Sequence, residues 1–74
     1  MITSQEQEQL DNWFTYHAPV GNQVAEYATI RDTAKSLAMV IVDLCPASVD
    51  RSAAIRLLRE CVMTANSSIA CCGK

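Results

Sequence analysis

The chain has only two glycines, Gly21 and Gly73, among its 74 residues. Phosphate-cradling loops of the GxGxxG and P-loop kinds need several glycines at fixed spacing, so the sequence excludes both. No basic segment followed by an apolar run opens the chain, and no run of 18 apolar residues occurs in it. Neither a secretory signal nor a membrane span is therefore indicated, and we expect a soluble cytoplasmic protein.

Histidine is as scarce as glycine, since His17 is the only one. The four cysteines, Cys45, Cys61, Cys71 and Cys72, contain no CxxC pair, and a zinc site normally takes four ligands from such patterns. We interpret the cysteines as small apolar helix residues of a reduced protein. The sequence thus predicts no metal site and no cofactor.

The sequence also offers few residues that could form a catalytic centre. His17 could act as a general base for Tyr16 or for a water molecule, but the sequence positions no carboxylate to orient it. A lone histidine close to a proline is more often a hydrogen-bonded loop residue. We therefore expect a protein that is not an enzyme.

The charge of −2 is unevenly distributed along the chain. The first eleven residues hold Glu6, Glu8 and Asp11 and no base, whereas the remainder holds six basic and five acidic side chains. Such a surface does not favour a long polyanion, so we expect no DNA or RNA partner. A small anion held by one or two arginines is compatible with it.

Three helices and no strands are predicted. A short helix over 4–13 starts at Ser4 as its N-cap, and an extended connector over 14–21 follows, because Pro19 cannot continue a helix. A long helix is expected over about 22–45, from Asn22 as its N-cap to the position before Pro46.

A second long helix is expected over about 49–70, capped by Ser48. Its connection to the first is so short that the two must pack antiparallel, which predicts one all-α helical-hairpin domain. Apolar residues at three and four residue steps predict the seam between the helices. Five apolar residues fall outside this seam: Ile30, Val40, Val42, Leu57 and Met63. They need a second buried face, which predicts a homo-oligomer.

Several motifs resemble a known family when read in order. "TYHAP…Q" covers the connector and the start of the first long helix, "YxxIR" lies on that helix and "MTAN" on the second. This order is similar to that of the phage helical-hairpin family that includes anti-CBASS protein two and the hairpin domain of Thoeris anti-defence protein one. The resemblance covers about residues 14–70.

The resemblance implies a phage immune-evasion protein that works in the host cytoplasm. It would be a homohexamer that binds and sequesters cyclic dinucleotides, cyclic trinucleotides or cyclic ADP-ribose messengers without cleaving them. Pockets would form between protomers, and the residues that match the family's dinucleotide pocket are Tyr16 and Arg31.

The chemistry of these two residues suits that role. A nucleobase can stack on Tyr16, and the guanidinium of Arg31 can fork onto a phosphate. Thr33 and His17 are candidate hydrogen-bond donors to the ligand. Phe14 is a further aromatic residue, of a kind that more often packs against protein than stacks on a base. The Asn66 amide is a candidate to bond a base edge or the backbone of a neighbouring helix. The alternatives for the first pair are a half-buried Tyr16 at the hairpin end and an Arg31 salt bridge to Glu26 or Asp32.

Two other function classes compete with this interpretation. The second-ranked class is a small helical oligomerisation or adaptor module whose aromatic connector binds a protein partner. The third-ranked class is an enzyme that degrades the messenger. Identification of any nucleotide that co-purifies with the protein would separate the classes.

Overall fold

A computed structural model describes all 74 residues as three helices without a strand. Helix α1 spans Ser4–Trp13, α2 spans Gln23–Leu44 and α3 spans Val49–Ala70. The predicted all-α class and the helical hairpin are therefore confirmed. Helix α2 is one residue shorter at each end than the predicted 22–45.

The start of α1 differs from the prediction by one residue. Thr3, not Ser4, is the N-cap, and its hydroxyl accepts a hydrogen bond from the Glu6 N–H at 3.1 Å. The Glu6 carboxylate in turn accepts from the Thr3 N–H at 3.0 Å, which completes a capping box. The prediction of Ser4 was wrong because the glutamate that closes the box lies three residues after Thr3.

Helix α2 begins without the cap that Asn22 was expected to supply. Asn22 occupies the N-cap position, but its side chain makes no capping hydrogen bond. The next side chain, Gln23, accepts from the Val20 N–H at 3.0 Å instead. Gly21 precedes these residues with φ of +55°, a left-handed conformation that glycine adopts without a Cβ clash.

The turn between α2 and α3 is held from both sides. The Ser48 hydroxyl accepts from the Arg51 N–H at 3.1 Å, as predicted for the N-cap of α3. The Arg51 guanidinium reaches back and donates to the carbonyls of Val42 and Cys45, at 3.3 Å each. Arg51 thus satisfies two of the carbonyls that the end of α2 leaves free.

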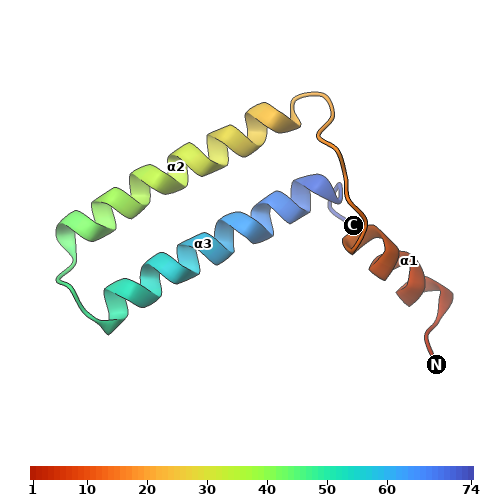
Figure 1. Ribbon diagram of the computed structural model, residues 1–74, viewed down its shortest axis with the longest axis horizontal. Helices are drawn as coiled ribbons and strands as arrows, with labels where there is room; N and C mark the ends of the chain where they lie inside the picture. The colour runs from red at the N-terminus through yellow and green to blue at the C-terminus, as the bar shows by residue number, and fades with distance from the viewer.

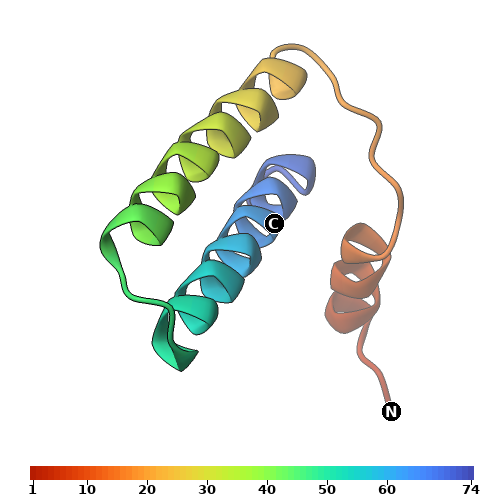
Figure 2. The same cartoon turned by 60° about the vertical axis from the view of Figure 1, so that its left-hand side comes forward.

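Helices α2 and α3 lie side by side and antiparallel (Figures 1 and 2), and α1 extends away beyond the C-terminal end of α3 (Figure 1). Side-chain donors tie α1 to the last residue: Gln9 Nε2 and Trp13 Nε1 donate to the Lys74 carbonyl at 2.9 and 3.3 Å. The molecule measures 49 × 34 × 15 Å. Its radius of gyration, 16.1 Å, exceeds the roughly 11 Å of a globular chain of this length.

No residue of the single chain is fully buried. The seam consists of half-buried residues, among them Tyr27, Ala34 and Ala38 on α2 and Leu58 and Val62 on α3. The accessible surface is 5980 Å², against about 4,500 Å² for a compact monomer of this mass. The chain therefore lacks a closed core of its own.

The apolar residues outside the seam follow the prediction with one exception. Val40, Val42, Leu57 and Met63 are at least half exposed. Ile30 is half-buried, so its assignment to the outer face was wrong. It lies one turn before Ala34, which is on the seam, so the two residues share a helix face. None of the three helices combines the length and the apolarity that a bilayer-spanning segment requires.

Candidate functional site

Tyr16 projects from the connector between two residues that are anchored to α1. The Thr15 hydroxyl donates to the Asp11 carbonyl, and His17 Nε2 donates to the Asn12 carbonyl at 2.7 Å. Tyr16 itself makes no hydrogen bond and is 74% exposed. The connector thus holds the ring outward, and the alternative of a half-buried tyrosine at the hairpin end is not what the chain adopts.

His17 is the hydrogen-bonded loop residue that the sequence offered as an alternative to a base. Its Nε2 shares the Asn12 carbonyl with the thiol of Cys71, whose sulfur lies 3.9 Å from the same oxygen. These contacts fasten the connector and the end of α3 to one point on α1. No three His, Cys, Asp or Glu side chains lie close enough together to hold a metal ion.

Arg31 lies on α2 with its side chain 69% exposed. Its nearest carboxylate is that of Asp32, with 3.9 Å between Nε and Oδ1, and Asp32 is itself exposed. Such a long contact on the surface contributes little, so the guanidinium keeps most of its donors free. Within one chain the alternative salt bridge is therefore weak, and Glu26 does not take part in it.

Thr33 does not share a face with Arg31. Two residues on an α-helix are about 200° apart around the axis, so their side chains point to nearly opposite sides. Thr33 is exposed, which leaves it available to a different surface. One chain cannot bring both side chains to the same group of a ligand.

Phe14 and Asn66 occupy opposite kinds of environment. Phe14 is 82% exposed, so its ring does not pack within the chain. Asn66 is half-buried on α3, and its Oδ1 is buried without a hydrogen-bond partner. A buried acceptor of this kind lacks the donor that it normally finds in a folded protein.

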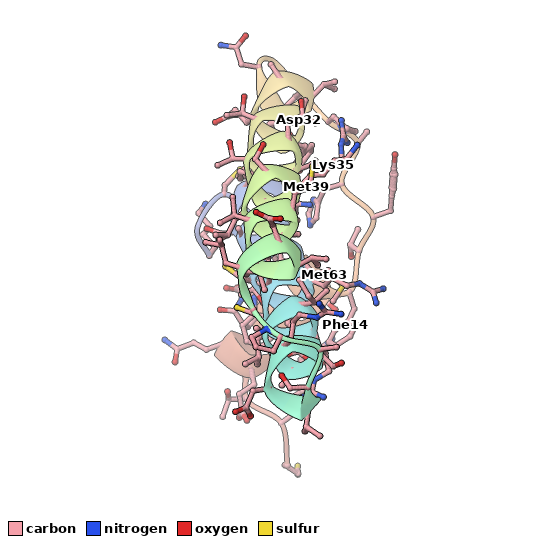
Figure 3. The ribbon with its side chains drawn as sticks, turned by 90° about the vertical axis from the view of Figure 1, so that its left-hand side faces the viewer. Phe14, Asp32, Lys35, Met39 and Met63 are labelled. Atoms are coloured by element: carbon pink, nitrogen blue, oxygen red, sulfur yellow. The ribbon has the colours of Figure 1, made fainter.

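A groove of about 290 Å³ runs between α2 and α3 beside Arg31. The basic side chains along it are Arg31 and Lys35 on α2 and Arg59 on α3. Ala34, Ala38, Ile55, Leu58 and Val62 form its apolar floor. Lys35 lies on α2 one turn before Met39, as the side-chain view labels them (Figure 3). The groove thus combines three cations with an apolar surface.

The structure does not gather the predicted site residues in one groove. Tyr16 does not line the groove that contains Arg31. Sequence reasoning missed Lys35, although its spacing of four residues from Arg31 on one helix face was a signal that could have revealed it. Arg59, like Arg56, was a further basic candidate on the second long helix that no motif singled out.

Comparison with known proteins adds one finding to this geometry. A search of curated proteins and a search of solved structures each gave no match. The family model for the Acb2/Tad1 hairpin domain matches residues 6–70, which is most of the chain and includes all of the hairpin. Members of that family act in the evasion of anti-phage defence. The chain belongs to the Acb2/Tad1 hairpin-domain family.

Proposed function

We propose that this protein binds and sequesters cyclic oligonucleotide messengers of bacterial immunity without cleaving them. The cyclic dinucleotides are the first candidates, and cyclic trinucleotides and cyclic ADP-ribose follow. Membership of the Acb2/Tad1 family supports the binding of small signalling molecules. Binding alone is sufficient for this function, because a messenger that the protein holds cannot reach its effector.

One observation carries the proposal. Tyr16 and Arg31 are both exposed, and neither has a strong partner within the chain. An aromatic ring that is held outward offers a face to a nucleobase, worth about 1–3 kcal/mol per stacked base. A free guanidinium offers a bidentate grip on phosphate. Together they match the two chemical features of a cyclic dinucleotide.

The pocket in this proposal forms between copies of the chain. Tyr16 stands on the connector and Arg31 in the hairpin groove, so a neighbouring copy would supply the second of the two. A homohexamer is the assembly that the family resemblance implies. The exposed apolar residues Val40, Val42, Leu57 and Met63 supply surface for such contacts.

The experiment uses capture and release. The protein is incubated with a slight deficit of one messenger from a panel of cyclic dinucleotides, cyclic trinucleotides and cyclic ADP-ribose isomers, and then filtered. We expect the free ligand to disappear from the filtrate. After denaturation of the retained protein, the same ligand should return with unchanged mass.

Two other outcomes identify the competing functions. Linear products after incubation would show that the protein cleaves the messenger and is an enzyme. If every member of the panel stays in the filtrate, sequestration is wrong. The adaptor function, in which the aromatic connector contacts a protein, then takes its place.

A further inference from the structure

We infer that Arg31, Lys35 and Arg59 form one anion-binding groove, and that Lys35 and Arg59 contact a phosphate of the bound nucleotide together with Arg31. The inference rests on the proposed function for the identity of the ligand. It extends the site from one basic residue to three and places the phosphates between α2 and α3.

The charges of the groove are not neutralised within the chain. Half of the six basic residues line it, and no acidic side chain does. The single ion pair of the molecule is the 3.9 Å contact between Arg31 and the exposed Asp32, so Lys35 and Arg59 have no carboxylate partner. Like charges that line one groove repel each other, and a bound anion removes that repulsion.

The spacing of the three cations fits small anionic groups. Arg31 and Lys35 are one turn apart, which is about 6 Å along α2. Arg59 faces them from α3, across a distance between helix axes that is typically about 8–10 Å. Long side chains of both types can converge on one phosphate or hold two neighbouring ones.

The floor of the groove selects for more than charge. Ala34 and Ala38, one turn apart on α2, have small side chains that leave the groove open, and Ile55, Leu58 and Val62 make its α3 wall apolar. An inorganic anion would leave this surface wet. A sugar or a base beside the phosphate would cover this apolar surface. The groove volume of about 290 Å³ accommodates part of one nucleotide rather than a whole cyclic dinucleotide.

The experiment has two probes and a matched control. Backbone amide shifts of the assembled protein are followed by NMR during titration with inorganic pyrophosphate, and cyclic di-GMP binding is measured by calorimetry. The variants are Lys35→Ala, Arg59→Ala and Arg56→Ala. Arg56 is the control because it is an exposed arginine of α3 that does not line the groove.

We expect pyrophosphate to shift the amides around 31–38 and 55–62 in the unsubstituted protein. Lys35→Ala and Arg59→Ala should each weaken the binding of both probes at least tenfold, whereas Arg56→Ala should leave it unchanged. If Arg56→Ala weakens binding as much as Arg59→Ala does, the groove is not the anion site. The same conclusion follows if pyrophosphate shifts amide signals elsewhere on the hairpin.

Two results separate this inference from the proposed function. If pyrophosphate binds in the groove but no messenger of the panel binds, the groove stands and sequestration of cyclic nucleotides fails. If Lys35→Ala or Arg59→Ala changes the mass of the assembly and Arg56→Ala does not, a neighbouring copy covers the groove. That result overturns the anion site.

Discussion

At the scale of single residues, substitutions of Tyr16 and Arg31 test the proposed function most directly. We expect Tyr16→Ala and Arg31→Ala each to weaken cyclic dinucleotide binding at least tenfold, about 1.4 kcal/mol, because each removes one of the two recognition groups. Isothermal calorimetry measures the loss, and light scattering checks that the assembly is unchanged.

The conservative variants make that prediction specific. Tyr16→Phe keeps the ring and should bind nearly as well as the unsubstituted protein. Arg31→Lys keeps the charge but loses the guanidinium fork, so its affinity should fall between those of arginine and alanine. Undiminished binding by both alanine variants would mean that the pocket lies elsewhere.

The sequence could indicate these residues but not their surroundings. Tyr16 and Arg31 belong to quoted motifs, and their chemistry can be read from residue type alone. The anchoring of Thr15 and His17 to α1 depends on where the connector turns back, which no local pattern specifies. Lys35 and Arg59 lie 24 residues apart in the chain. They share a groove only through the register of α2 against α3.

At the scale of elements, the capping box at the start of α1 makes this helix sensitive to acid. The Thr3 N–H, and then the Thr3 hydroxyl, lower the pKa of the Glu6 carboxyl below its ordinary value. A lowered pKa in the folded state stabilises α1 above the ordinary glutamate pKa, and this contribution is lost as the pH falls through the lowered value.

We therefore expect α1 to lose order on acidification before the hairpin does. The amide signals of residues 3–13 should report the loss by NMR during a titration from pH 7 to acid. Glu6→Gln keeps the hydrogen-bonding capacity of the box without its titration, so this part of the pH dependence should disappear. An identical acid response of Glu6→Gln would contradict the role of the carboxylate.

The turn between α2 and α3 provides a second prediction at this scale. Arg51→Ala should lower the free energy of unfolding by about 1 kcal/mol, because the Val42 and Cys45 carbonyls lose a charged donor at a partly exposed site. Denaturation by urea at one fixed protein concentration measures it. The control Arg56→Ala removes the same side chain where it has no such contact, and an equal loss there would contradict the capping role.

The helices themselves were largely predictable, and their caps were only partly so. The position of Pro46 and the spacing of apolar residues specify where α2 ends and which face it buries. The N-caps depend on which side chain closes a ring of hydrogen bonds, and neighbouring candidates such as Thr3 and Ser4 differ little in sequence terms. Asn22 holds the N-cap position of α2 without a capping bond, and the nearby side-chain contact is the one that Gln23 makes with the Val20 N–H of the connector.

At the scale of the whole molecule, the missing core predicts association. The single chain exposes about 1,500 Å² more than a compact monomer of its mass, and much of its apolar surface is included. We expect no monomer at micromolar concentration. Light scattering settles the point, and a mass near 8.1 kDa would overturn both the assembly and a pocket shared between copies.

A matched pair of variants locates the surface responsible for association. Leu57→Asp places a charge on an exposed apolar position and should shift the population toward smaller species. Thr33→Asp makes a comparable change at an exposed position that is already polar, so it should leave the mass unchanged. Assembly that tolerates Leu57→Asp would place the interface on another face.

A flat chain only 15 Å thick, with no fully buried residue, also has a kinetic consequence. Such a chain gains most of its stability only when it meets a copy, so the rate of productive folding rises with the square of the chain concentration. A newly synthesised chain at low abundance stays open to proteolysis, because cleavage is first order and association is second order. Accumulation of the protein in a cell should therefore have a threshold: slow synthesis yields fragments, and a rapid burst of translation yields long-lived protein.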